Sequence, residues 1–372
     1  MTRGVYGSAS SSGGIWNVIQ LIFIVSGVAF YFSYYRKRER VIGVLLLYSL
    51  WIMLVSLVNS AVHPFTSVAS FFYSIMCPCT PLVLLIFYCA GQENGTHCLS
   101  FCIKATYYIL IVMYYISMTN YRTIESDEYI AFSDIYYPLC LLPLVLMNTK
   151  PIRSLIPILA IIVGIIISGK RGGLIVVALV AIVYYLFRGK SKRRGSVFML
   201  LFLATTIWAS SYFIAYLDAH YGLQTINRMI NAAEDGGSGR VERWHLIWSE
   251  IETSSLWQIL FGHGFDSVSD LVGSRAHNDF LEVLYNYGLF SFGLYLCFHI
   301  GLIMTNIRQF RKRYPLAKFF TCSIIISLVM AMVSFYIVEP TYVLSSMFVT
   351  GLILGDWATY NKSKNQSKEY TL

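Results

Sequence analysis

The first candidate for chemistry is a pair of basic residues in a glycine-rich break between two apolar stretches. Lys170 and Arg171 stand within the sequence SGKRGG at residues 168–173. Glycines allow a backbone to turn tightly and to approach a ligand closely. A helix that opens near Gly172 would point its unpaired N–H groups and positive dipole end at the water layer that Arg171 faces. This arrangement predicts a phosphate-binding turn, with Arg171 the stronger candidate; the alternative is a turn whose basic side chains only touch lipid headgroups.

A second candidate is the sequence GGSGRVERWHLIW at residues 236–248. Ser238 can cap a helix that begins near Arg240. Arg243 and Trp244 follow three and four residues after Arg240, so the three side chains would share roughly one helix face. A guanidinium group holds phosphate through two parallel hydrogen bonds, and an indole can stack on a sugar ring. The alternative is an amphipathic helix that lies on the membrane with Trp244 as an anchor, and both descriptions can hold together.

A third candidate is the sequence RAHNDFLEVLYNYG at residues 275–288. His277 can accept a proton near neutral pH, and Asn278 or Asp279 could orient the imidazole or bind a hydroxyl group. An isolated surface histidine usually has no catalytic role. His277, however, stands where a polar loop re-enters an apolar region, beside other polar groups, and this position favours a functional role.

The elements that must position these residues are membrane helices. Of the 372 residues, 56% are hydrophobic and 13% are charged, whereas soluble domains usually have about 25% charged residues. Apolar stretches of about 20 residues match the roughly 30 Å hydrocarbon core, since each helical residue rises about 1.5 Å. Eleven such stretches occur, at approximately 15–35, 41–62, 68–90, 99–118, 129–147, 154–168, 173–187, 197–217, 281–304, 317–337 and 342–357. The short stretches 154–168 and 173–187 could instead form one re-entrant hairpin.

The predicted fold is therefore all-α: a polytopic integral membrane helical bundle of about 11 transmembrane helices, in a single domain over residues 1–372. One large polar loop, residues 218–280, separates predicted spans 8 and 9. Most of the 28 Lys and Arg residues fall in short loops on one side if the N-terminus is outside and the C-terminus is cytoplasmic. Most of the others cluster at 168–173 and in the large loop, which indicates an anionic partner on the outer face; the alternative is that long loops cross the membrane regardless of charge.

Several kinds of site are not indicated by the sequence. All eight cysteines lie in or beside apolar stretches, so we expect neither a disulfide framework nor a thiolate metal site in the loop. There is no zinc-protease, Walker or dinucleotide motif, and we expect no metal and no cofactor. The segment 260–265, with the glycines Gly262 and Gly264, is interpreted as a turn that returns the loop toward the membrane.

Four segments, taken in order, resemble the O-antigen polymerase and ligase superfamily of bacterial envelopes. They are the S-G-x-R-G-G turn at 168–173, the G-R-x-x-x-W element at 239–244, the G-x-G-F stretch at 262–265, and H-N-x-x-L followed by a distant glycine at 277–288. The resemblance implies a metal-independent glycosyltransferase with a polyprenyl-diphosphate sugar donor.

By the same resemblance, Arg171 and Arg240 would hold the diphosphate and His277 would act near the acceptor hydroxyl. Arg243 and Arg275 are weaker assignments. The predicted catalytic residues are thus His277, Arg240 and Arg171, and the predicted substrate-binding residues are Lys170, Arg243, Trp244, Arg275 and Asn278. The family often has a small or polar residue where this chain has Lys170.

The chain has one predicted span fewer than the twelve usual for ligases, which favours a surface-polysaccharide polymerase. Such an enzyme transfers an undecaprenyl-diphosphate-linked glycan to the hydroxyl of another lipid-linked repeat unit, with inversion if displacement is direct. The expected partners are these donor and acceptor lipids, the bacterial inner membrane and, optionally, a chain-length regulator, with no nucleic acid; the active site would face the periplasm. The alternatives are an O-antigen ligase that transfers polymer to a lipid A core, a lipid-linked glycan transporter, and a structural or sensory membrane protein.

Overall fold

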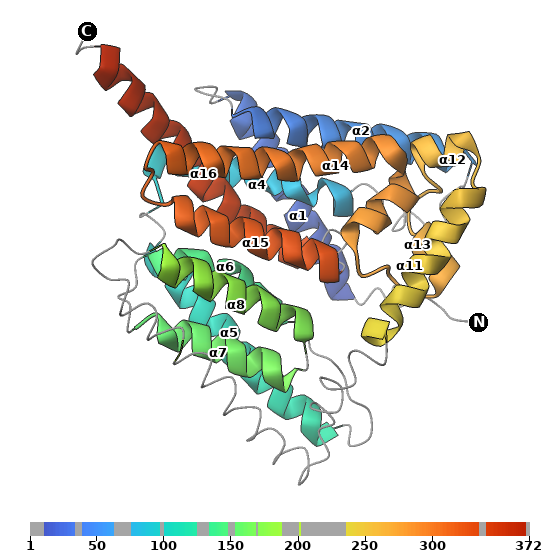
Figure 1. The fold of residues 1–372 in the computed structure, drawn as a ribbon, viewed down its shortest axis with the longest axis horizontal. Coiled ribbons are helices and arrows are strands. Elements are labelled where there is room, and N and C mark those ends of the chain that lie inside the picture. The colour runs from blue at the N-terminus through green and yellow to red at the C-terminus, as the bar shows by residue number, and fades with distance from the viewer. Residues whose placement is uncertain are drawn as a thin grey trace. The chain divides into compact units, whose positions relative to one another are not determined.

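The computed structural model describes residues 11–33, 39–62, 76–96, 100–124, 134–147, 153–168, 170–187, 201, 236–334 and 340–369 (Figure 1). All elements in these ranges are helical. In the N-terminal half they are α1 (Ser11–Ser33), α2 (Arg40–Val62), η1 (Thr80–Val83), α4 (Leu84–Asn94), α5 (Ser100–Ile124), α6 (Tyr136–Met147), α7 (Leu155–Ile167) and α8 (Arg171–Leu186). In the C-terminal half they are α11 (Gly236–Thr253), α12 (Leu256–Phe261), α13 (Ser267–Val272), α14 (Asp279–Arg311), α15 (Ala317–Val333) and α16 (Pro340–Glu369).

The chain forms two compact units, which are described separately. The first contains residues 1–96, 239–314 and 331–372, and the second contains residues 97–238 and 315–330. The single membrane domain over 1–372 and the large loop at 218–280 stay predictions, and residues 218–235 of that loop lie outside the described ranges.

The helices have the character of membrane segments. Among the described residues, two stretches are long and apolar enough to cross a membrane, Arg40–Ser60 in α2 and Asp279–Arg311 in α14. Shorter apolar helices accompany them: Leu21–Ser33, Phe101–Ser117, Tyr136–Met147, Leu155–Ile167, Gly172–Leu186 and Ala317–Val333. The predicted all-α class is confirmed for the described residues, and their apolar helices are consistent with a membrane protein. The count of eleven spans stays a prediction, and of the expected span 197–217 only Leu201 is described.

The long helix α14 exposes many apolar side chains and buries several polar ones. Its exposed apolar residues include Leu289, Phe290, Leu296, Ile300, Ile303, Met304, Ile307 and Phe310. Its buried polar residues include Ser291, His299, Thr305, Asn306 and Gln309. This pattern matches a helix whose outer face meets hydrocarbon while its polar groups face the protein interior.

Helices α4 and α16 of the first unit pack closely because glycines lie at their contact. A Cβ atom added to Gly351 would lie 2.6 Å from the carbonyl oxygen of Leu84, and one added to Gly355 would strike the carbonyl oxygen of Tyr88. Gly351 and Gly355 are four residues apart, a spacing that lets two membrane helices bring their backbones together. The Asp356 carboxylate, one residue further on, accepts hydrogen bonds from the backbone N–H of Thr96, just after α4, and from the hydroxyl of Tyr314, three residues past the end of α14.

In the second unit, tyrosines of α5 donate hydrogen bonds to backbone carbonyls of α7. The hydroxyl of Tyr107 donates to the carbonyl oxygen of Pro157 at 2.6 Å, and that of Tyr114 donates to Gly164 at 2.8 Å. Each bond satisfies a buried hydroxyl that would otherwise be costly in an apolar interior. Helices α7 and α8 lie side by side (Figure 1).

Candidate functional site

Residues 236–288 build a small folded region, here called the loop module. It includes the first turns of α14, which begins at Asp279. Helices α11, α12 and α13 surround a core of buried apolar residues that α14 completes. The core residues are Ile247, Val268, Ala276, Leu281 and Tyr285, with Trp244, Ile251, Leu271 and Val272 packed around them. The predicted polar loop is thus a packed structure with its own core over the part that is described.

The loop module is joined to α14 through two glycines that are 26 positions apart in the chain. Gly262 has φ of 82° and Gly288 has φ of 79°, values that side chains rarely tolerate. A Cβ atom on Gly288 would strike the carbonyl of Leu260, and one on Gly262 would strike the carbonyl of Asn286. The backbones therefore meet where only hydrogen atoms fit, and α14 is kinked at Gly288.

His263 completes this junction. Its backbone N–H donates to the carbonyl oxygen of Tyr285 at 2.9 Å, and its ring stacks on the Tyr285 ring with centroids 4.0 Å apart. Its Nε2 lies 2.9 Å from the Ser254 hydroxyl. These contacts agree with the interpretation of residues 260–265 as a structural turn.

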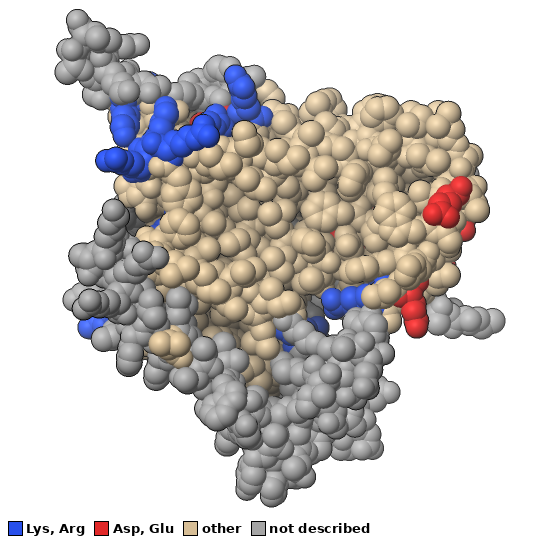
Figure 2. Space-filling model, in the orientation of Figure 1, with Lys and Arg blue, Asp and Glu red and all other residues tan. Residues whose placement is uncertain are grey.

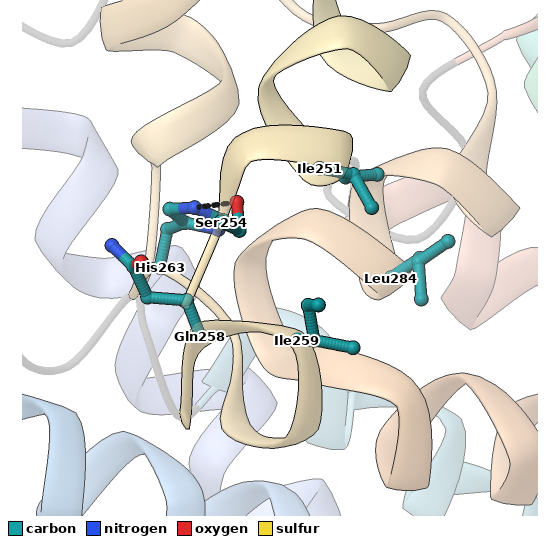
Figure 3. A pocket seen from close by; sticks show the side chains of 6 residues that line it. All are labelled: Ile251, Ser254, Gln258, Ile259, His263 and Leu284. Atoms are coloured by element: carbon teal, nitrogen blue, oxygen red, sulfur yellow. Dashed lines mark hydrogen bonds between the residues drawn. The ribbon is translucent and has the colours of Figure 1, made fainter. Parts of the chain in front are cut away.

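A hollow lies next to His263, between α11, α12 and α14 (Figure 3). It is lined by Ile251, Ser254, Gln258, Ile259, His263 and Leu284, and its cavity volume is about 10 Å³. Ligand sites usually enclose roughly 300–1,000 Å³. The hollow contains none of the eight predicted site residues and is too small for a glycan, so we do not assign it to substrate.

The N-terminal part of α11 carries the predicted arginines. The helix begins at Gly236, so Ser238 lies inside its first turn and not at the expected cap before Arg240. Gly239, however, has φ of 70°, so the regular helical backbone begins close to Arg240, near the start that the sequence predicted. Arg240 is half-buried, and its Nη1 donates to the carbonyl oxygen of Val333 at 2.7 Å. The Arg243 guanidinium lies beside Gly239, since a Cβ atom there would be 3.9 Å from its Nη2.

Trp244 connects α11 to the segment that carries His277. Its indole Nε1 donates to the carbonyl oxygen of Ala276 at 2.7 Å, and its ring packs against the core of the loop module. The indole thus supports the loop module itself. Stacking of Trp244 on a sugar stays a prediction.

Arg275 is engaged by two carboxylates of the loop module. Its Nη1 pairs with Asp266 and with Oε1 of Glu282, the latter at 3.2 Å. The other Glu282 oxygen, Oε2, accepts the backbone N–H of Ala276 at 3.0 Å. Burial raises the pKa of the Asp266 carboxyl, and the charge of Arg275 acts in the opposite direction. These two ion pairs lie within the loop module, and binding of substrate by Arg275 stays a prediction.

Sequence reasoning gave no role to Glu282 and Asp266. A signal for Glu282 was present, because an acidic residue just inside an apolar span must be paired, and Arg275 was the nearest basic residue in the chain. No comparable signal existed for Asp266, whose contact depends on how α13 folds back.

His277 and Asn278 occupy the entry to α14. His277 is half-buried and has φ of 55°, in the left-handed region that non-glycine residues seldom adopt. Asn278 is the N-cap: its Oδ1 accepts the backbone N–H groups of Phe280 at 3.0 Å and Leu281 at 3.3 Å. The Asn278 side chain therefore stabilises the helix start, a role that asparagine before an apolar run often has. Asp279 is buried, and it accepts a hydrogen bond from the Tyr295 hydroxyl at 3.2 Å.

Lys170 and Arg171 belong to the second unit. Arg171 is the first residue of α8, as the sequence predicted, and Gly169 lies outside the described residues. Lys170 precedes the helix, and its charge interacts with the Asp134 carboxyl. Gly173 lets the start of α8 pack against Tyr136, since a Cβ atom there would lie 3.1 Å from that ring. The structure thus confirms the break between two apolar helices, and phosphate binding by this turn stays a prediction.

A comparison with known protein families matches residues 156–296 to the family model described as O-antigen ligase. Residues 156–296 are therefore similar to the O-antigen ligase and polymerase superfamily. No curated protein matches the chain.

The O-antigen ligase and polymerase match extends from α7 to the first half of α14 and includes every predicted site residue, from Lys170 to Asn278. This similarity supports, at a coarse level, a membrane enzyme of the glycosyltransferase type with lipid-linked glycan substrates. The match does not separate polymerases from ligases.

Proposed function

We propose that the protein is a surface-polysaccharide polymerase that transfers a glycan from undecaprenyl diphosphate to the hydroxyl group of a second lipid-linked repeat unit. The observation that carries the proposal is the hydrogen bond from Trp244 to Ala276, because it joins the arginine-bearing start of α11 to the segment of His277. Cationic groups for a diphosphate and an imidazole for a hydroxyl group are the two functions that this transfer needs.

In the proposed reaction, Arg171 and Arg240 neutralise the donor diphosphate while the acceptor hydroxyl lies near His277. The acceptor oxygen forms a bond to the anomeric carbon, and the bond between that carbon and the phosphate oxygen breaks. The diphosphate leaves with the electron pair, and His277 takes the hydroxyl proton. A diphosphate is a good leaving group, so charge neutralisation and positioning can supply most of the catalysis without a metal. A direct displacement inverts the anomeric centre.

The charge distribution supports an active site on the periplasmic face of the inner membrane. The end of α14 next to α16 carries a cluster of basic side chains (Figure 2). Its members include Arg308, Arg311, Lys312 and Lys364. Basic residues that flank membrane helices favour the cytoplasm, so the other end of α14, with the loop module, would face outward.

The second candidate is an O-antigen ligase, which would transfer finished polymer to a lipid A core. The description of the matched family supports it, and the chemistry at the anomeric carbon is the same. A deletion strain distinguishes the two enzymes. Loss of a polymerase leaves a core with a single repeat unit, whereas loss of a ligase leaves a bare core and lipid-linked polymer. A chain-length regulator would be a partner of the polymerase only.

The direct test is extension of a defined undecaprenyl-diphosphate oligosaccharide by the purified protein, with product length read by mass spectrometry. Arg171→Ala, Arg240→Ala and His277→Ala should each lose extension, by about 10²–10⁴-fold where a proton transfer is removed. Arg311→Ala is the matched control, because Arg311 is an exposed arginine in the last turn of α14 and should have wild-type activity. Wild-type product from all three variants would reject the assignment, and movement of the lipid without extension would favour a transporter.

A further inference from the structure

The backbone around His277 is fixed on both sides by side chains from elsewhere in the loop module. Before it, Ala276 is fully buried and uses both of its backbone groups: its N–H donates to Glu282, and its carbonyl oxygen accepts from Trp244. After it, Asn278 caps α14, and its own carbonyl oxygen accepts the backbone N–H of Glu282 at 2.9 Å. The left-handed backbone of His277 lies between these two fixed residues.

A non-glycine residue in this conformation is strained, and such strain persists only where the surrounding structure over-determines it. Glu282 makes contacts on both sides of His277, through its side chain to Ala276 and through its backbone to Asn278. Its carboxylate side chain is 2% exposed and is held in place by Arg275, whose side chain is 10% exposed. A buried, paired carboxylate keeps a single orientation, which is what a rigid support requires.

We propose that Glu282 is a positioning residue that holds the backbone of His277 in its left-handed conformation and thereby aims the imidazole at the acceptor hydroxyl. Arg275 has the supporting role of keeping the Glu282 carboxylate paired and correctly turned. The inference rests on the proposed function, because it assigns to His277 the proton transfer described above. It adds that the geometry of His277 is set by an acidic residue five positions later in the chain.

The first test is the Glu282→Gln variant in the extension assay. Glutamine has the same shape, but its amide cannot accept from both Arg275 and Ala276 as the carboxylate does. We expect kcat to fall by about 10–100-fold, the range associated with misplacement of a catalytic group by about 1 Å. KM for the lipid donor should stay close to the wild-type value, because the arginines that bind the diphosphate are unchanged. Glu250→Gln, at an exposed glutamate on α11, is the matched control and should leave kcat unchanged.

A double-mutant cycle separates positioning from general destabilisation. In a His277→Ala background, with imidazole added to restore a measurable rate, Glu282→Gln should cause little further loss, because residues that act as a unit are not additive. A full second loss in that background would overturn the inference, as would a wild-type kcat for Glu282→Gln alone. The His277→Ala variant tests the proposed function separately. If it is inactive, the proposed function is retained even when the role of Glu282 is rejected; if it is fully active, the proposed function is rejected.

Trp244→Phe tests the same idea from the other side of Ala276 and serves if Glu282→Gln does not fold. Phenylalanine keeps an aromatic face for packing or for a sugar, but it cannot donate to the Ala276 carbonyl. A loss of kcat with unchanged KM supports the inference, and a wild-type kcat from this variant contradicts it.

Discussion

The junction between Gly262 and Gly288 provides a sharp test of the loop module, through the single change Gly288→Ala. Gly288 has φ of 79° and ψ of 178°, a combination that is essentially restricted to glycine. The added methyl group would also meet the carbonyl of Leu260 and would lie 2.6 Å from the backbone nitrogen of Gly262. Both effects act against the same contact between α12 and α14.

The expected cost is the sum of these two effects. Holding alanine in this backbone region costs about 1–3 kcal/mol, and forcing a methyl group into a close-packed contact costs about 1–3 kcal/mol more. The free energy of unfolding of the loop module should therefore fall by about 2–6 kcal/mol. A loss of this size is large compared with the usual 5–15 kcal/mol that stabilises a folded domain.

Gly293→Ala is the matched control within the same helix. A Cβ atom at Gly293 would have no neighbour within 4 Å. Alanine is favoured over glycine in a helix by about 0.5–1 kcal/mol, so this variant should be as stable as the wild type or slightly more stable. The two variants make the same chemical change five residues apart, and they differ in the backbone conformation at the glycine and in the atoms around it.

The assay is thermal unfolding in detergent, followed by tryptophan fluorescence and by limited proteolysis of the loop module. Trp257 is a local reporter, because its ring packs on Phe261 with centroids 4.2 Å apart. Gly288→Ala should lower the Tm by several degrees and expose residues near α12 to protease, whereas Gly293→Ala should not. Equal behaviour of the two variants would refute the close backbone approach at Gly288.

Two further predictions concern other contacts. Gly355→Val should weaken the packing of α16 on α4, because the valine side chain would strike the Tyr88 carbonyl. Its Tm should be lower than that of Gly43→Val, a control at a glycine whose added Cβ would meet no atom within 4 Å. Equal Tm values would argue against the glycine contact. Asn278→Ala should lower the free energy of unfolding by about 1 kcal/mol through loss of the α14 cap, whereas Asn278→Asp should keep most of the capping energy. If the aspartate variant lowers the Tm as much as the alanine variant, Asn278 does not act as a cap.

The helical class and the helices that carry the predicted site residues could be predicted because they depend on local patterns. Apolar length alone indicates α2 and α14, and the glycines around Lys170 mark the break before α8. An asparagine before an apolar run, such as Asn278, is a recognisable helix cap. The same residue type also allows the binding of a hydroxyl group, and the sequence alone does not choose between the two roles. Local spacing also put Arg240, Arg243 and Trp244 on one helix, which α11 confirms.

The internal roles of Arg275, Glu282 and Trp244 could not be predicted in the same way. The Trp244 indole meets a carbonyl 32 residues away, and nothing in the spacing of α11 indicates which way the ring turns. The contact of Gly262 with Gly288 likewise depends on the chain reversing through α12 and α13. Such long-range contacts follow from tertiary packing, and a sequence shows only that glycines or charges are present, not what they meet.

We propose that Arg171, Arg240 and His277 act on one lipid-diphosphate glycan. The most direct measurement uses an undecaprenyl-diphosphate oligosaccharide with a photoreactive group next to the diphosphate, cross-linked to the purified protein and mapped by mass spectrometry. We expect cross-links to residues 168–173, 239–244 and 275–278, and we expect unlabelled lipid to suppress them. Cross-links confined to other segments, or unaffected by competing lipid, would contradict the proposal.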